Sequence, residues 1–315
     1  METVLITGGC GFIGSHLAER IVQSGYRVKV FDNLSTGHTE NIEHLKPMPE
    51  LIEGDVRDFG QVERVTQGVN RVFHLAALVS VAESVERPVL CHDVNVTGAL
   101  NVLEACRVHH VKRMILASSA AVYGSEPTLP KSEEMLPAPE SPYAASKLTG
   151  EMYARLYARL YGVETVSLRF FNVYGPRQDP SSMYSGVISR FTRQMLTNET
   201  LTIFGDGRQT RDFVFVKDVV QAAVLAMIST ELGRGEVMNI ASGASISLLS
   251  LLEALESLTG RKVVPSFAEE RIGDVRYSEA SVARMLNLLG FRAVHSIRSG
   301  LESLLSYESS RISGA

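Results

Sequence analysis

The chain has 315 residues, of which 45% are hydrophobic and 21% are charged, and its formal net charge at pH 7 is -4. This composition allows a sizeable core and excludes global disorder, and the charge gives no reason to expect nucleic acid or an anionic membrane as a partner. The three cysteines have no paired or metal-like spacing, and the first residues enter a strand pattern with no signal segment or apolar span, so we expect a cytoplasmic protein without a structural metal.

A short apolar run at residues 4–6 is followed at once by a glycine-rich turn at residues 8–14 and then by a helix pattern. Strand, glycine turn and helix start, in this order, indicate a pyrophosphate site, because the N–H groups and the dipole of a helix N-terminus favour negative charge. A second strand pattern over residues 27–31 ends at Asp32. A carboxylate at this place binds a ribose and repels a 2′-phosphate, which favours NAD over NADP.

Further strand patterns at residues 51–52, 71–75 and 114–117 alternate with helix patterns. This alternation predicts an α/β fold with a doubly wound parallel sheet of the Rossmann type. His74 lies inside one of the apolar strands, so we interpret it as a hydrogen-bonded core residue rather than a catalyst. Residues 93–110 read as one long helix.

Two motifs carry chemistry. Ser119 stands at the end of the strand over residues 114–117, and Tyr143 and Lys147 are four residues apart, after Ser141 and Pro142. Serine and proline there predict a helix N-cap and first turn, so the tyrosine and the lysine share one helix face. We expect the ammonium to lower the phenol pKa from its usual value of about 10, towards acid/base behaviour.

The pattern changes after the strand that ends near residue 172, where polar loops and short elements replace the regular alternation. We predict an NAD-binding Rossmann domain over residues 1–172, to which residues 212–240 return. Residues 173–211 and 241–315 then form a smaller C-terminal α/β lobe for the substrate. No linker rich in Pro, Gly or Ser separates the two parts, so we expect them to pack directly on each other.

In combination, these motifs resemble the extended short-chain dehydrogenase/reductase family, and within it the NAD-dependent UDP-hexose 4-epimerases. The resemblance runs from the first strand to about residue 290. The motifs that carry it are Thr7-Gly8-x-x-Gly11-x-x-Gly14, Asp55, Ser119, Tyr143-x-x-x-Lys147, Asn172-Val-Tyr-Gly-Pro-Arg177, Arg211-Asp212 and Arg271-x-Gly-Asp274.

The resemblance implies a reaction. Tyr143, assisted by Ser119, removes the proton of the sugar 4-hydroxyl while C4 gives a hydride to NAD, and the 4-keto sugar turns over before the hydride returns to its other face. The residues implied to hold NAD are Gly8, Gly11, Phe12, Ile13, Asp32, Asn33, Asp55, Val56, Ala76, Ala77, Asn95, Tyr143 and Lys147.

The resemblance also implies a substrate site, in which Ser119 and Tyr143 face the sugar. The nucleotide end is assigned to Asn172, Val187, Thr202, Phe204, Arg211, Arg271 and Asp274. The position seven residues after Arg271 forms one wall of the sugar pocket, and here it is Ser278. A small residue there admits a 2-N-acetyl group, which predicts interconversion of UDP-GlcNAc and UDP-GalNAc, with UDP-Glc and UDP-Gal as slower substrates. An alignment slip of one residue would put Tyr277 at the wall and reverse this prediction.

Other functions remain open at this point. Related dehydratases and decarboxylases need acidic groups where this chain has Ala120 and Ala121, and alanine can do no proton chemistry. The remaining alternatives are a 4-epimerase of plain UDP-hexoses only, a 4-epimerase of UDP-uronic acids, and a non-catalytic NAD-binding protein on the same scaffold. The resemblance further implies a homodimer built on the helices around residues 94–110 and 142–161.

Overall fold

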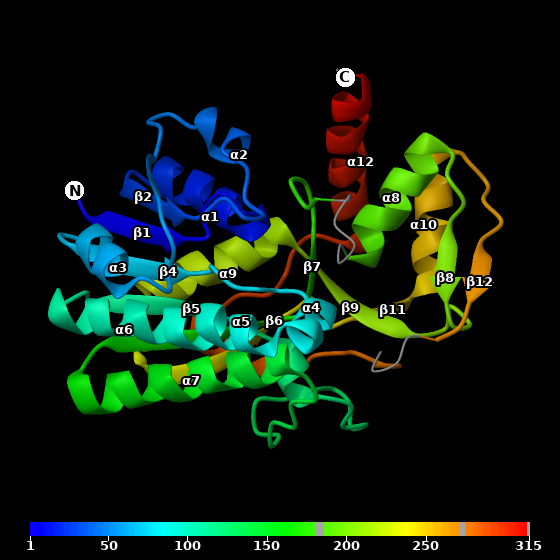
Figure 1. Cartoon of the computed structure of the whole chain (residues 1–315). Coiled ribbons are helices and arrows are strands. Elements are labelled where there is room, and N and C mark those ends of the chain that lie inside the picture. Colours follow the sequence, from blue (N-terminus) through cyan, green and yellow to red (C-terminus); the bar gives the residue numbers. More distant parts are fainter. Residues whose placement is uncertain (180–185, 271–274, 314–315) are drawn as a thin grey trace.

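The computed structural model describes residues 1–179, 186–270 and 275–313. A parallel seven-stranded sheet lies at the centre of its larger part (Figure 1). The sheet confirms the predicted doubly wound Rossmann fold. Its chain order reverses between β1 and β4, the kind of switch point at which such folds bind ligands. In spatial order the strands are β10 (Arg234–Ile240), β6 (Glu164–Phe170), β5 (Arg113–Ser119), β4 (Arg71–His74), β1 (Thr3–Thr7), β2 (Arg27–Asp32) and β3 (Glu50–Glu53).

Helices cover both faces of this sheet, because its strands are apolar on both sides. One face carries α1 (Phe12–Gln23) and α9 (Val216–Ile228), and the other carries α3 (Phe59–Thr66), α6 (Gly98–Val108) and α7 (Pro142–Tyr161). Short helices α2 (Glu40–Glu43), α4 (Val81–Glu86) and α5 (Pro88–His92) lie in the connections. As predicted, His74 is a core residue: it is buried and its Nδ1 lies 2.7 Å from the Thr7 hydroxyl.

The single helix predicted over residues 93–110 is wrong in one respect. The segment begins with a π-helical turn over Asp93–Thr97, and only then continues as α6. The turn includes Asn95, whose side-chain amide donates to the Leu78 carbonyl and to the Ser146 hydroxyl and accepts from the Leu78 N–H. These bonds join the turn to α7 and to the loop after β4. The spacing of apolar residues, on which the prediction of one helix was based, gives no information about such bonds.

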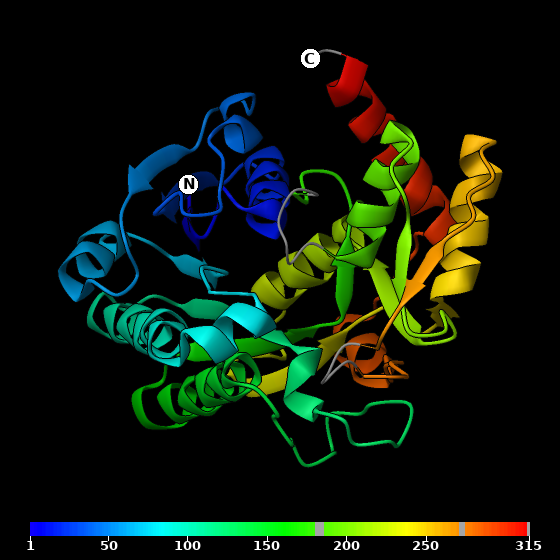
Figure 2. The same cartoon turned by 45° about the vertical axis from the view of Figure 1, so that its right-hand side comes forward.

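The smaller part of the structure lies beyond the carboxyl ends of the large sheet, at the right of Figure 1 and on the same side in Figure 2. Its three-stranded sheet is formed by β11 (Ser245–Ser247), β9 (Thr210–Phe215) and β7 (Asn172–Tyr174), and a pair of strands by β12 (Ser266–Ala268) and β8 (Thr202–Phe204). The helices here are α8 (Val187–Thr197), α10 (Leu248–Thr259) and α12 (Ile297–Ser313), whereas α11 (Ala283–Leu289) packs against β10 and α9 of the larger part. The domain boundaries given above stay a prediction.

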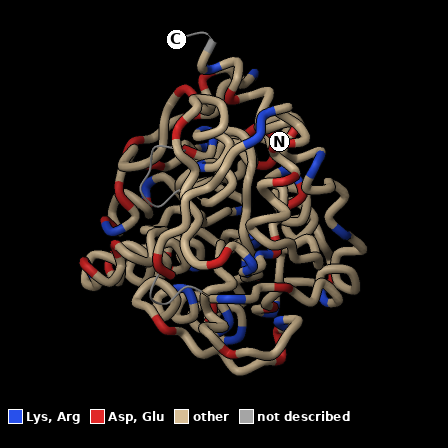
Figure 3. The backbone as a smooth tube through the Cα atoms, turned by 90° about the vertical axis from the view of Figure 1, so that its right-hand side faces the viewer, with Lys and Arg blue, Asp and Glu red and all other residues tan. Residues whose placement is uncertain are grey.

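Figure 3 shows basic and acidic residues interspersed along the chain, in keeping with the small net charge. Within the described residues, no helix combines the length and apolarity that crossing a membrane requires.

Arg113, at the start of β5, holds the carboxyl end of α9 against the sheet. It is buried and donates to the carbonyl oxygens of Ala226, Met227, Ser229 and Leu232. The last carbonyls of a helix have no partner within the helix, so a buried helix end depends on donors of this kind. Arg113 also pairs with Glu164 on the neighbouring strand.

We predict that Arg113→Met lowers the free energy of unfolding by about 3 kcal/mol, because a buried carbonyl left without its donor costs about 1–3 kcal/mol. Urea unfolding measures this change. The exposed neighbour Lys112 provides the control, since Lys112→Met should change the free energy of unfolding by less than about 0.5 kcal/mol. Equal stability of the two variants would contradict the role of Arg113.

Candidate active site

The glycine turn between β1 and α1 forms a cradle that leaves no space for side chains. Gly8 has φ +71°, and a Cβ atom built on it would lie 2.7 Å from the backbone nitrogen of Ala76. A Cβ atom on Gly14 would lie 2.1 Å from the Gly8 carbonyl oxygen. No side chain caps α1, which follows Gly11 directly. The N-terminus of α1 therefore fits a pyrophosphate, which is held by backbone N–H groups.

The predicted adenosine residues lie together at the ends of β2 and β3. The Asp32 carboxylate is buried and accepts hydrogen bonds from the backbone N–H groups of Cys10 and Leu34, both at 2.9 Å. Each carboxylate oxygen can accept a second hydrogen bond. The Asn33 amide donates to Asp55, and Arg57 donates to both Asp55 oxygens, which lowers the pKa of Asp55 to about 2. Asp55 is thus ionised at neutral pH.

The other predicted cofactor residues flank this cradle. Phe12 and Ile13 are partly exposed in the first turn of α1, and Ala76 and Ala77 are partly exposed just after β4. Val56 lies just after β3, and its buried side chain faces Gly98. Asn95 differs from these residues, because its side-chain amide already forms hydrogen bonds within the protein, as described above. Its predicted contact with NAD stays a prediction.

The three predicted catalytic residues meet between β5 and α7. Ser141 caps α7 and Pro142 occupies its first turn, as predicted. Ser119, the last residue of β5, lies near enough to the Tyr143 hydroxyl to lower the pKa of this phenol. Lys147 is buried one helical turn further on, where its ammonium donates to the Ala117 carbonyl at 3.0 Å and lies 5.8 Å from the centre of the Tyr143 ring.

The prediction that Lys147 lowers the pKa of Tyr143 is wrong for the protein without a bound cofactor. Burial raises the pKa of Tyr143, and the hydrogen bond with Ser119 opposes this only in part. Burial also lowers the pKa of Lys147 to about 8. The lysine remains an ammonium at neutral pH, but its hydrogen bond goes to the Ala117 carbonyl instead of the phenol. Desolvation of the phenolate therefore decides the direction in which the pKa of Tyr143 moves.

A pocket of ≈210 Å³ lies between α8, β8 and β9. Its lining includes five of the residues predicted for the nucleotide end of the substrate, namely Asn172, Val187, Thr202, Phe204 and Arg211. They come from three separate strands and a helix, so only the folded chain brings them together. Arg211 supplies a fork-like donor set that suits a diphosphate.

Three further polar residues line this pocket, and the sequence analysis missed them. Gln178 is held by the Ser189 hydroxyl, which donates to its side-chain oxygen. The Arg190 guanidinium lies 5.7 Å from the centre of the Phe204 ring. Gln209 donates to the Phe204 carbonyl. Arg190 reaches the pocket from α8, Gln178 through its bond to Ser189 of α8, and Gln209 through its bond to β8, so these positions depend on the folded chain.

Arg271 and Asp274 lie outside the described residues. Ser278 is described: it is partly buried, and its backbone N–H donates to the carbonyl of Thr210, next to Arg211. Ser278 does not line the pocket of ≈210 Å³ itself. Tyr277 is 49% exposed, and its hydroxyl accepts a hydrogen bond from Arg276.

Comparisons with known proteins agree with this geometry. The NAD dependent epimerase/dehydratase family matches residues 4–241. A putative UDP-glucose 4-epimerase of Methanocaldococcus jannaschii is 39% identical and is matched over 96% of this chain and 97% of that protein. The structure of UDP-glucose 4-epimerase from Thermotoga maritima with UDP-glucose is 38% identical, with a TM-score of 0.94 over 98% of this chain and 99% of that one.

A third relative differs in its sugar. The structure of UDP-N-acetylglucosamine 4-epimerase from Methanobrevibacter ruminantium, in complex with UDP-N-acetylmuramic acid, is 34% identical and has a TM-score of 0.94 over 98% of this chain and 99% of that one. The predicted cofactor, NAD, and the predicted class of enzyme are thereby confirmed. The chain belongs to the NAD dependent epimerase/dehydratase family and, within it, to the NAD-dependent UDP-sugar 4-epimerases.

Proposed function

We propose that the protein interconverts UDP-GlcNAc and UDP-GalNAc, with UDP-Glc and UDP-Gal as slower substrates. The observation that carries the reaction is the grouping of Ser119, Tyr143 and Lys147 between β5 and α7, at the end of the sheet that also carries the glycine cradle. The choice of sugar is supported by the small Ser278 at the predicted pocket wall and by the similarity to a UDP-N-acetylglucosamine 4-epimerase.

In this proposal the chain supplies acid/base chemistry and orientation. Tyr143 accepts the proton of the sugar 4-hydroxyl and later returns it, while Ser119 holds the phenol oxygen by a hydrogen bond. Lys147 keeps a positive charge near the phenol at neutral pH, because its pKa is about 8. NAD, when bound, would supply the hydride acceptor and donor for C4, and its positive charge would favour the Tyr143 phenolate that burial disfavours. Arg211 and Asn172 hold the UDP end.

The competing reactions of the family fit the site less well. Ala120 and Ala121 form the start of a 3-10 helix directly after Ser119. Elimination of water would need an acid and a base at this place, and a methyl side chain provides neither. A UDP-uronic acid needs a cation for its 6-carboxylate, and no side chain of the described site is assigned to that group.

We predict that Tyr143→Phe lowers kcat for epimerisation at least about 100-fold, because a positioned acid/base group contributes about 10²–10⁴-fold. NAD content should stay the same, as the ring and the helix are retained. The control is Tyr161→Phe on the same helix, since Tyr161 is 53% exposed. Turnover by NMR and NAD content by absorbance measure both effects, and unchanged turnover in Tyr143→Phe would eliminate the proposed base.

We predict that Ser278→Tyr lowers kcat/KM for UDP-GlcNAc at least about tenfold more than for UDP-Glc, because a ring at the wall occupies the space of the acetamido group. Tyr277→Ser tests whether Tyr277 forms the pocket wall instead of Ser278. It should leave the ratio of the two kcat/KM values unchanged, because Tyr277 is exposed. Retained preference for UDP-GlcNAc in Ser278→Tyr would refute the pocket-wall assignment.

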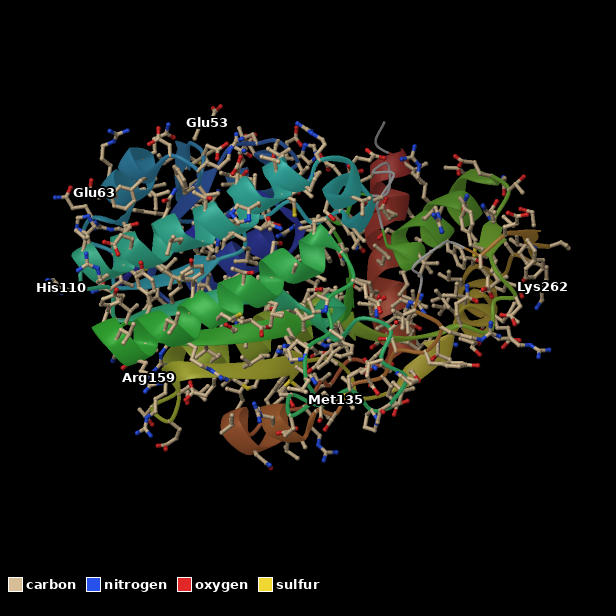
Figure 4. All side chains as sticks on the ribbon, turned by 60° about the horizontal axis from the view of Figure 1, so that its bottom comes forward. Glu53, Glu63, His110, Met135, Arg159 and Lys262 are labelled. Carbon is tan, nitrogen blue, oxygen red and sulfur yellow. The ribbon has the colours of Figure 1, made fainter. Side chains whose placement is uncertain are left out.

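The homodimer implied by the family resemblance is also part of the proposal. Helices α6 and α7 pack side by side, as Figure 4 shows, and α7 presents an exposed apolar row at helical spacing. Met152 is 60% exposed, Leu156 44% and Leu160 62%. Exposed apolar rows of this kind mark interaction surfaces.

We predict that Leu156→Glu shifts the protein from dimer to monomer in sedimentation velocity, because a carboxylate would be buried without a partner in the interface. Lys217→Glu, at an exposed position of α9 on the opposite face of the sheet, serves as the control and should leave the dimer intact. A wild-type protein that sediments as a monomer would rule out this interface.

A further inference from the structure

A single buried carboxylate joins several segments around the substrate pocket. Asp212 is 0% exposed and directly follows Arg211 on β9. It accepts four hydrogen bonds: from the Ser242 N–H at 2.8 Å and the Ser242 hydroxyl at 2.7 Å, from the Gly243 N–H at 3.1 Å and from the Ala280 N–H at 3.2 Å. An ionised carboxylate only accepts hydrogen bonds and has about four acceptor sites, so these four donors occupy all of them.

These donors come from segments that connect the two parts of the structure. Ser242 and Gly243 follow β10, a strand of the large sheet, and lead into β11 of the three-stranded sheet. Ala280 belongs to the segment that leads from Ser278 towards α11. β9 carries Asp212 between these segments, and Figure 1 shows β9 and β11 side by side at the junction. The carboxylate therefore attaches two separate stretches of chain to β9.

The groups around Asp212 are those assigned to the substrate. Arg211 precedes it in the chain, and the Asn172 side chain donates to the Asp212 backbone carbonyl at 3.3 Å. The Ser278 N–H donates to the carbonyl of Thr210 at 3.2 Å. A shift of Asp212 would thus move the diphosphate arginine, the pocket asparagine and the predicted sugar wall together.

We propose that Asp212 is a positioning residue for the UDP-sugar: its carboxylate fixes Arg211, Asn172 and the Ser278 segment relative to one another without touching the substrate. The inference rests on the proposed function, since these groups matter for a ligand only if the UDP end binds in the pocket. Asparagine at this position cannot take over the role. Its amide oxygen can accept the two hydrogen bonds that one carboxylate oxygen accepts. Its NH₂ group then meets the two N–H donors of the other oxygen, and a donor cannot accept from them.

Asp218 provides a matched control. It is 2% exposed, stands on α9, and accepts hydrogen bonds from the backbone N–H groups of Val294 and His295 and from the His295 ring. It therefore has the burial and the network of Asp212, but its partners lead into α12 and none of them lines the pocket. Asp218→Asn reports what loss of a buried carboxylate network does to stability alone.

The test measures the dissociation constant of UDP by calorimetry on the NAD-saturated protein, together with the melting temperature. Both Asp212→Asn and Asp218→Asn should melt at a lower temperature than the wild type. Only Asp212→Asn should weaken UDP binding, by about tenfold, as expected when charged hydrogen bonds that hold a site are lost. The KM for UDP-GlcNAc should rise by a similar factor, measured well below the melting temperature of each variant.

Two results would overturn the inference: UDP binding in Asp212→Asn equal to wild type, or equal weakening in Asp218→Asn. If Asp212→Asn does not fold, Ser242→Ala replaces it, because this change removes one donor and keeps the carboxylate. It should weaken UDP binding about threefold, and unchanged binding would again overturn the inference. Wild-type protein that binds neither UDP nor a UDP-sugar would refute the proposed function, and this inference would fall with it.

Discussion

The active site depends on one constraint of the sheet, namely that all seven strands run in the same direction. Their carboxyl ends therefore meet at a single edge, where β1 delivers the glycine turn, β2 delivers Asp32 and β5 delivers Ser119. The glycine turn approaches the end of β4 so closely that a Cβ atom on Gly8 would collide with the Ala76 backbone. This close approach leaves the N-terminus of α1 open to a pyrophosphate, at the same edge of the sheet as Ser119.

Burial has two opposite effects at this edge. It brings Tyr143, Ser119 and Lys147 together in a site of low dielectric, where hydrogen bonds and charges act strongly. It also raises the pKa of Tyr143 and lowers the pKa of Lys147, which makes the phenol a weaker acid in the protein alone. In the proposed reaction, the positive charge of bound NAD would be what favours the phenolate form of Tyr143. A phenol tuned in this way suits a reaction in which proton and hydride are both removed and both returned.

The sequence predicted those parts of the site that are built from local motifs. The glycine turn, Asp32 at the end of β2, and the Ser141 cap that starts α7 each depend on a few neighbouring residues, and the structure has them where the patterns indicate. The π-helical turn at Asn95 was not predicted, because its cause is a set of hydrogen bonds to Leu78 and Ser146, far away in the chain. For the same reason the direction of the Tyr143 pKa was predicted wrongly, since burial is a property of the folded chain. The pocket residues Gln178 and Arg190 were missed because only the packing of α8 turns them towards the other lining residues.

The central claim is that the hydrogen on C4 of the sugar is removed and returned within one binding event, with Tyr143 handling only the hydroxyl proton. It is tested most directly with UDP-GlcNAc that carries deuterium at C4, incubated with the NAD-saturated protein in ordinary water and analysed by NMR. The account predicts UDP-GalNAc that keeps its deuterium at C4. UDP-GalNAc with solvent hydrogen at C4, or no UDP-GalNAc at all, would contradict it.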